Sequence, residues 1–341
     1  MFKQLLRQVA EGESLTREEA RNAMRLIMEG EAQPMQIAGF LTALRMKGET
    51  VDEIVGFAET MREKAVRLNT DGEGLLDTCG TGGDGGISFN ISTAAALVAA
   101  AGGVRVAKHG NRAVSSKSGS ADVLEALGVT ITTTPEAAER CLEETNLCFL
   151  FAPQYHQAMK HAVEPRRQLG FRTVFNLLGP LTNPARADRQ LLGIYDRNLG
   201  LKIADVLNEM GVKRALVVAG ADGLDEISVS EPTYIVEVDH GAISSYTIHP
   251  EMFGLSSHPL TDIAGGDARE NAGIIRRILD GEPGAYRDVV VLNAAAAFYL
   301  SEQVGSIAEG VRLVEELLDT GRAKHKLAQL IQVTGGVSHA F

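Results

Sequence analysis

A glycine-rich loop that joins a short apolar strand to an alanine-rich helix constrains the fold of this chain most strongly. Leu75-Leu76-Asp77 has the pattern of a buried strand, residues 80–86 contain five glycines, and the alanine-rich helix begins near Ser92. Glycine tolerates positive φ and leaves backbone N–H groups open to a close neighbour. This order predicts one unit of an α/β sheet, with the loop at the carboxyl end of the strand.

The alternation of strands and helices continues along the chain. Further strand patterns, mostly separated by helical patterns, lie at 104–107, 147–151, 190–195 and 214–219. The stretch 233–248 alternates like a hairpin, and the chain is mostly helical from about 288. Such alternation is typical of a sheet covered on both faces. We therefore predict an α/β domain over 75–341, with a mostly parallel central sheet flanked by helices.

Residues 1–70 contain helical patterns only. Capping boxes begin at Thr16 and Thr50, and Pro34 suits the first turn of a helix between them. A chain of 341 residues is longer than one compact core usually accommodates. We therefore expect a small all-helical domain over 1–70, followed by a linker at 71–74.

Composition excludes several classes of protein. The net charge of −11 disfavours nucleic-acid binding, which requires basic surface. Cys79, Cys141 and Cys148 form no CxxC pair, which argues against a disulfide framework or a structural zinc site. The N-terminus has no signal-peptide core, and the longest apolar run, 94–101, is too short to cross a membrane. We expect a cytoplasmic protein that binds neither nucleic acid nor membrane.

Two stretches of this acidic chain are depleted of acids. With 44 Asp and Glu in 341 residues, a stretch of 37 should contain about five. None lies between Asp84 and Asp122, whereas the basic residues there include Arg105, Lys108, Arg112 and Lys117. The stretch 145–187 has one acid, Glu164, among Arg166, Arg167, Arg172 and Arg186. Chance and helix burial are the alternative, but the pattern predicts two anion-binding surfaces.

The glycine loop is a candidate phosphate site. It lacks the terminal Gly-Lys-Ser/Thr of a Walker A loop. Asn90-Ile91-Ser92-Thr93 follows at the start of the alanine-rich helix, where free N–H groups and the helix dipole favour an anion. The alternatives are a plain loop and simple N-capping by Asn90 or Ser92.

A basic turn follows the second strand. Lys108-His109-Gly110-Asn111-Arg112 offers a point charge, an arginine fork and neutral hydrogen-bonding groups. Serines at 115, 116, 118 and 120 follow it. The alternative is a solvated basic loop with a packed His109. Two polar loops after two adjacent strands favour a shared phosphate site.

An acidic pair, Asp225-Glu226, follows the strand at 214–219. Adjacent carboxylates suit Mg²⁺, which takes one or two carboxylates together with substrate phosphates and water. The alternative is an ordinary exposed turn. A diphosphate bound nearby would require such a cation.

Together these motifs resemble the anthranilate phosphoribosyltransferases of tryptophan biosynthesis, over nearly the whole chain. The resemblance is carried by Gly80–Asp84, Asn90–Thr93, Lys108–Arg112, Arg172–Pro184 and Asp225-Glu226. It implies a helical domain joined to a larger α/β domain, and a homodimer formed through the helical domains. We expect a segment near 165–190 to complete the helical domain.

The resemblance also implies roles for individual residues. Those implied to contact phosphoribosyl diphosphate are Gly80, Gly83, Asp84, Ser88, Asn90, Ile91, Ser92, Thr93, Lys108, His109, Gly110, Asn111, Arg112, Ala113, Val114, Ser115, Ser116 and Ser120. Gly80, Asn111 and Arg166 would contact anthranilate, with His109, His156 and Gly179 along its entry path. Ser92, Asp225 and Glu226 would hold two Mg²⁺ ions per subunit. Lys108, Asn111 and Arg166 would be catalytic.

The expected reaction needs no strong base, because the amino group of anthranilate is already nucleophilic. Its difficult step is departure of diphosphate from the ribose carbon, where Mg²⁺, Lys108 and loop N–H groups would stabilise the growing negative charge. One departure is Gln157, where the family has proline after histidine. It frees φ and restores an N–H near the acceptor site.

Two related functions remain open at this point. A pyrimidine-nucleoside phosphorylase shares the general architecture and a glycine-rich phosphate loop, but Arg166 and Asp225-Glu226 fit a carboxylate acceptor and a metal-bound diphosphate better. A non-enzymatic nucleic-acid-binding relative would need a basic surface and eroded metal ligands, and the net charge of −11 opposes it.

Overall fold

The computed structural model describes residues 1–82, 86–113 and 117–335. Its sheet has the strand order β3-β2-β1-β4-β5-β6-β7. The strands are β1 (Leu75–Gly80), β2 (Arg105–Gly110), β3 (Leu147–Phe151), β4 (Arg189–Gly193), β5 (Arg214–Gly220), β6 (Thr233–Asp239) and β7 (Ala242–Ile248). The pairs from β3 to β5 are parallel, whereas β6 and β7 are antiparallel. The predicted mostly parallel α/β sheet is confirmed.

The strand order reverses at β1. The chain proceeds from β1 to β2 and β3 on one side, then returns to place β4 and β5 on the other. Parallel α/β sheets bind ligands at the carboxyl ends of the strands beside such a reversal. Gly80 at the end of β1 and Gly193 at the end of β4 mark this point.

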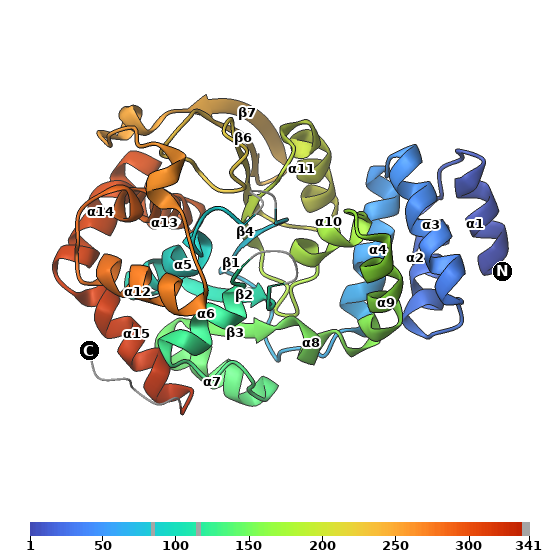
Figure 1. Ribbon diagram of the computed structural model, residues 1–341, viewed down its shortest axis with the longest axis horizontal. Helices are drawn as coiled ribbons and strands as arrows, with labels where there is room; N and C mark the ends of the chain where they lie inside the picture. The colour runs from blue at the N-terminus through green and yellow to red at the C-terminus, as the bar shows by residue number, and fades with distance from the viewer. Residues whose placement is uncertain (83–85, 114–116, 336–341) are drawn as a thin grey trace.

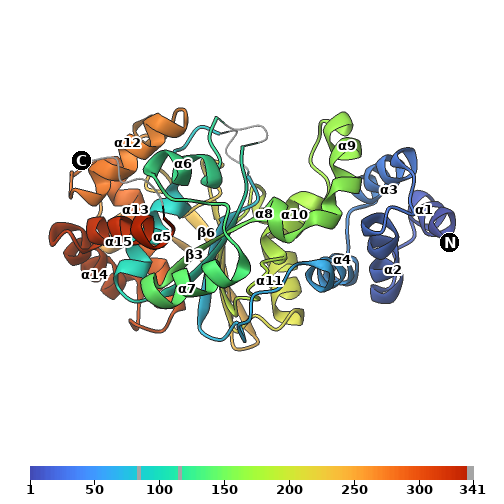
Figure 2. The same ribbon diagram turned by 90° about the horizontal axis from the view of Figure 1, so that it is seen from below.

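Small residues allow helices to lie close to the sheet. Helix α5 (Ile91–Ala101) is almost wholly buried and packs against α13 (Ala285–Leu300), which contains the alanine run 294–297. In Figure 2 the sheet lies between α5, α13, α14 (Ile307–Asp319) and α15 (Arg322–Val333) on one side and α10 (Val174–Leu181) and α11 (Gly200–Glu209) on the other. Helices α6 (Ser120–Leu127), α7 (Pro135–Thr145) and α12 (Ala268–Leu279) complete the α/β part.

The first helices form a separate lobe, at the right of Figure 1. They are α1 (Phe2–Ala10), α2 (Arg17–Met28), α3 (Pro34–Lys47) and α4 (Val51–Lys64). Capping boxes at Thr16 and Thr50 and Pro34 in the first turn of α3 are confirmed. Helix α9 (Lys160–Leu169) packs on α2 and α3, and α10 packs on α3 and α4. The short helix α8 (Ala152–Tyr155) leads from β3 towards α9.

Within the described ranges, no helix has the length and apolar character needed to cross a bilayer.

Candidate active site

The loop after β5 folds back over the ends of β1 and β4. The backbone N–H of Gly82 donates to Oδ2 of Asp225 at 2.9 Å. A Cβ added to Gly193 would lie 1.6 Å from the Asp225 carbonyl oxygen, and one added to Gly80 would lie 2.4 Å from Oδ2. Because any side chain would displace the acid, both strands have to end in glycine here.

Glu226 lies against the first turn of α5. The backbone N–H of Ser92 donates to Glu226 Oε1 at 3.1 Å. The following residue, Ile227, is anchored to α13, since its N–H and carbonyl both bond to the buried amide of Asn293. Asp225 and Glu226 are each only 8% exposed, so the alternative of an ordinary exposed turn is wrong. Burial, then the neighbouring Asp225, raise the pKa of Glu226 to about 8, opposed by Lys108.

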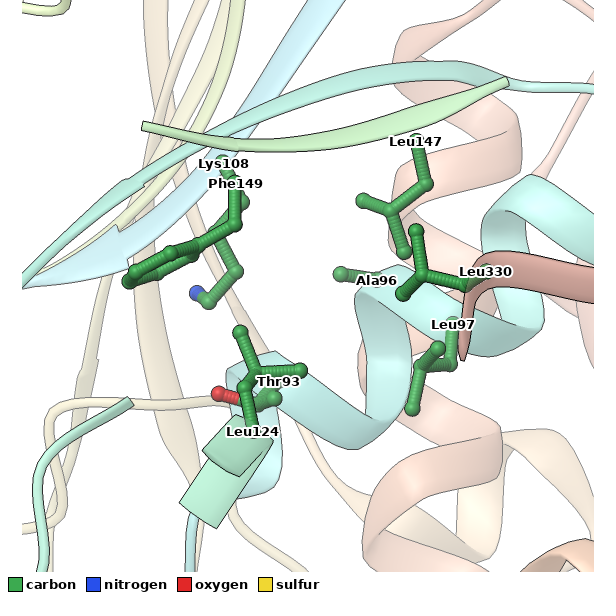
Figure 3. A pocket seen from close by; sticks show the side chains of 8 residues that line it. All are labelled: Thr93, Ala96, Leu97, Lys108, Leu124, Leu147, Phe149 and Leu330. Atoms are coloured by element: carbon green, nitrogen blue, oxygen red, sulfur yellow. The ribbon is translucent and has the colours of Figure 1, made fainter. Parts of the chain in front are cut away.

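Lys108 is 3% exposed and reaches the same place from β2. Its Nζ donates to the Thr78 carbonyl at 2.5 Å and to Ser92 Oγ at 3.2 Å. Burial lowers the pKa of Lys108, and Asp77 opposes this. Figure 3 shows its stem beside Phe149 and above Thr93 of α5. The cavity there has a volume of only about 10 Å³, so packing fixes the stem and only the ammonium is left to interact with a ligand.

These residues fit a Mg²⁺ site. Burial and then repulsion from the adjacent Asp225 carboxylate disfavour the charged form of Glu226, so its pKa is raised. Among the described residues, no group of three or more His, Cys, Asp or Glu side chains could hold a metal. Mg²⁺ does not need one, because substrate phosphates and water complete its oxygen shell. The donor set of Ser92 Oγ and two carboxylates has this character.

Asn90 is fixed by partners that the sequence did not indicate. It stands at the N-cap position of α5 but makes no side-chain cap, so the simple capping alternative is wrong for this residue. Instead, its amide donates to the Ser118 carbonyl at 3.1 Å and accepts from Nδ2 of the buried Asn271 at 3.0 Å. Asn271 in turn accepts from the Gly266 N–H at 2.7 Å. No local motif marked Asn271, which comes from α12.

The turn after β2 makes polar contacts with α6. Ala121 N–H donates to the Asn111 carbonyl at 3.2 Å, and a Cβ on Gly110 would lie 2.2 Å from Ser120 Oγ. The Arg112 guanidinium bonds to Asp122 at 2.9 Å and to both carboxylate oxygens of Glu125. A phosphate would therefore have to compete with these carboxylates for Arg112.

His109 and His156 face each other, with ring centroids 5.1 Å apart. Burial, then His156, lower the pKa of His109 to about 3, and burial lowers the pKa of His156 to about 4. Both rings are therefore neutral near pH 7. Hydrogen bonds to the backbone of Gly179 and Thr182 oppose these shifts and join the rings to α10. Open space lies where a Gly179 side chain would be.

Arg166 lies on α9, over the ring of Phe175 at 5.0 Å from its centroid. Burial lowers its pKa. Within the part of the chain that the structure describes, its guanidinium makes no hydrogen bond or ion pair. Gln157 begins a short 3₁₀ turn before α9, and its amide donates to the Gln154 carbonyl.

Arg172 connects the second basic stretch to the glycine loop. Its guanidinium donates to the Gly82 carbonyl at 3.0 Å and stacks over Tyr195 at 4.2 Å. The sequence motif included Arg172, but no role was predicted for it.

The remaining predicted residues divide into two groups. Ser88 forms an isolated antiparallel β-bridge with Ala264. Ile91 and Thr93 are buried in α5. The Ala113 N–H donates to the Asp122 carboxylate. The predicted contacts at Gly83, Asp84, Val114, Ser115 and Ser116 lie outside the described residues.

Comparison with known proteins agrees with this architecture. Residues 72–324 match the glycosyl transferase family a/b domain, and residues 3–65 match its helical bundle domain. Anthranilate phosphoribosyltransferase from Brevibacillus brevis is 57% identical, covering 100% of both chains. The Petrotoga mobilis enzyme of that name is 51% identical over 99% of this chain and 98% of its own.

Solved structures agree as well. That of anthranilate phosphoribosyltransferase from Thermus thermophilus superposes with a TM-score of 0.92 at 46% identity, covering 97% of this chain and 99% of the other. The Saccharomyces cerevisiae enzyme in complex with PRPP and Mg gives 0.90 at 27% identity, covering 98% of each.

A helical bundle joined to an α/β sheet, with a glycine loop and buried acids at the strand reversal, defines a member of this glycosyl transferase family. Within that class, the chain belongs to the anthranilate phosphoribosyltransferases.

The contact between Gly193 and Asp225 can be tested by adding one methyl group. We expect Gly193→Ala to destabilise the protein by roughly 3 kcal/mol and to displace the acidic loop, because a Cβ cannot fit 1.6 Å from a carbonyl oxygen. Chemical denaturation measures the change. Gly273→Ala, in α12 with open space around it, should instead be neutral or stabilising by roughly 0.5–1 kcal/mol. Equal stability of the two variants would contradict the contact.

Proposed function

We propose that the protein transfers the phosphoribosyl group of 5-phosphoribosyl 1-diphosphate to the amino group of anthranilate, in tryptophan biosynthesis. The products are N-(5-phosphoribosyl)anthranilate and diphosphate. The observation that best supports this proposal is that Asp225, Glu226, Lys108 and the first turn of α5 meet at the strand reversal. The yeast relative in complex with PRPP and Mg supports the donor, and its complex with 4-fluoroanthranilate supports the acceptor class.

The diphosphate is the group that this convergence suits. The Lys108 ammonium and the positive end of the α5 dipole offer positive charge to phosphate oxygens, and the resemblance implies further contacts from the loop that follows Gly80. The other residues that we propose to contact phosphoribosyl diphosphate are those that the family resemblance implies. Lys108 is poised to act when the bond between ribose C1 and the diphosphate oxygen breaks, because charge grows on that oxygen.

Ser92, Asp225 and Glu226 would hold Mg²⁺, with two ions per subunit as our proposal. A cation held by these residues would supply positive charge against the negative charge of the diphosphate. The anthranilate nitrogen forms the new bond to C1 and then loses a proton, so the chain needs no covalent nucleophile. The buried Cys79 thiol, whose pKa is raised by burial, is unsuited to that role.

Arg166 would bind the anthranilate carboxylate, and Asn111 would orient the acceptor beside Gly80. A partly buried guanidinium that makes no hydrogen bond or ion pair to the described residues is suited to a charged ligand. The neutral His109 and His156 rings and Gly179 would line the entry path, where uncharged rings suit an aromatic acceptor.

We further propose the domains as 1–70 and 75–341, with α9 and α10 completing the first, and a homodimer formed through the helical lobe. Met35, Gly39, Thr42 and Met46 lie at helical spacing on α3, and Met35 and Met46 are 87% and 83% exposed. Such a stripe is suited to meeting its own copy. A cytoplasmic location is supported by three buried cysteines that remain thiols.

The transfer reaction is tested by mixing the protein with anthranilate, phosphoribosyl diphosphate and Mg²⁺ and following the loss of anthranilate fluorescence. We expect loss only when all three are present, and its abolition by a chelator. Asp225→Asn with Glu226→Gln should lower kcat/KM roughly 100-fold or more, because the leaving-group charge loses its cation. Asp205→Asn, an exposed acid of α11, is the matched control. No turnover by folded wild-type protein would refute the function and direct attention to thymidine phosphorolysis or DNA binding.

The acceptor role of Arg166 is tested by Arg166→Gln. Losing a charge-assisted hydrogen bond to the carboxylate should raise the KM for anthranilate roughly 10- to 100-fold. The KM for phosphoribosyl diphosphate should stay unchanged. The neighbouring Arg167→Gln is the control, since Arg167 is exposed and pairs with Glu164. Equal effects of both variants on anthranilate KM would remove Arg166 from the site.

The proposed dimer is tested by light scattering. The expected mass is about twice the 36.4 kDa of one chain. Met35→Glu with Met46→Glu should give monomers, because charge at both ends of the stripe opposes burial. Met252→Glu, exposed on the α/β part, should leave the mass unchanged. A monomeric wild type contradicts the dimer.

A further inference from the structure

Strands β1 and β2 pair over an unusually short length. Their ladder covers only Leu75 with Arg105 and Leu76 with Val106. By contrast, β1 pairs with β4 over Leu76–Gly80, and β2 pairs with β3 over Val106–Gly110. Strands β1 and β2 therefore separate as they approach the site, although each stays paired with its other neighbour in the sheet.

Side chains replace the ladder where it stops. The His109 N–H donates to Asp77 Oδ1 at 3.2 Å, and Asn183 Nδ2 donates to the Ala107 carbonyl at 2.7 Å. Ala107 and His109 are alternate residues of β2, so these backbone groups face the same neighbour. Lys108 Nζ completes the set with its bond to the Thr78 carbonyl of β1.

Asp77 is an unusual residue for this place. It lies in the interior strand β1 at 1% exposure, where a carboxylate is costly unless it is well bonded. Burial raises its pKa to about 6, opposed by Lys108, Asn183 and the His109 amide. An apolar residue would fill the space but would leave a buried N–H of β2 without an acceptor.

We propose that Asp77 is a positioning residue for the transfer reaction. Its carboxylate, bonded to the His109 amide, fixes the separation of β1 and β2 at which the loop from Gly80 and the turn from Lys108 bind one diphosphate between them. This inference rests on the proposed function. The substrate is contacted by those two loops, and Asp77 acts through His109 and Lys108.

Two variants separate the hydrogen bond from the charge. Asp77→Asn keeps an acceptor oxygen for the His109 amide, whereas Asp77→Leu has a similar shape but no acceptor. We expect Asp77→Leu to speed hydrogen exchange in residues 105–113 and to lower kcat/KM roughly 10- to 100-fold, as for a buried donor left without a partner. It should also weaken binding of phosphoribosyl diphosphate with Mg²⁺. Asp77→Asn should keep exchange protection and stay within about three-fold of wild-type kcat/KM.

A remote control separates positioning from stability. Glu237 is a buried carboxylate of β6, away from the β1 and β2 loops. It accepts hydrogen bonds from the hydroxyl groups of Tyr246 and Tyr299. Glu237→Leu should lower stability while leaving kcat/KM of the folded fraction unchanged.

The outcomes are distinct. Wild-type kcat/KM in folded Asp77→Leu would overturn the proposal. A ten-fold or larger loss of kcat/KM in Asp77→Asn, with protection from hydrogen exchange retained, would also overturn the proposal, because the charge of Asp77 would then be the requirement. The comparison of Asp77→Asn with wild type decides even when Asp77→Leu does not fold. If wild-type protein does not turn over anthranilate, the proposed function fails. Two measurements, hydrogen exchange in residues 105–113 and binding of phosphoribosyl diphosphate, then still decide the role of Asp77.

Discussion

The burial of Asp225 and Glu226 is the interaction on which the rest of the site depends. Two adjacent carboxylates removed from water carry a large free-energy cost unless donors surround them. The donors come from different parts of the chain, namely the Gly82 and Ser92 amides and, nearby, the Lys108 ammonium. Only the strand reversal brings the ends of β1 and β4, the start of α5 and the β5 loop together. The topology is thus a condition for holding the acids.

Much of the fold could be predicted from the sequence because its signals are local. A capping box such as the one at Thr50 depends on residues three apart, and strand patterns depend on the composition of five or six residues. The residue types of the site were also readable, since the acidic pair follows β5 and Lys108 was expected just after the second strand, at the same edge of the sheet. The expectation of a turn from Lys108 was wrong in one respect, because β2 continues to Gly110 and Lys108 lies inside it. Their burial followed from the fold and could not be read from the turn sequences themselves.

The parts that could not be predicted depend on contacts between distant residues. Asn271 orients Asn90 from 181 positions away, and Asn293 anchors the residue after Glu226 from α13. No spacing rule connects such pairs. Arg112 is a different case, since its guanidinium was predicted from the sequence to bind phosphate. The acids that end its acid-free stretch, Asp122 and Glu125, are its partners in the structure.

Helix α10 connects the strand ends, where we propose that the phosphoribosyl donor binds, to α9, which carries the proposed acceptor residue Arg166. On one side it packs against α3 and α4 of the helical lobe, and α9, which carries Arg166, packs on α2 and α3 of that lobe. On the other side its end is attached to the sheet, because Gln190 donates to the Pro180 carbonyl at 2.7 Å and Asn183 donates to β2. The Arg166 guanidinium has no such bond to the sheet. The distance between Arg166 and the residues proposed to bind diphosphate therefore depends on packing between helices, whereas Asp225, Glu226, Ser92 and Lys108 are held together by hydrogen bonds. If Arg166 binds the acceptor as we propose, a shift of the helical lobe would change acceptor binding first and leave the proposed donor site intact.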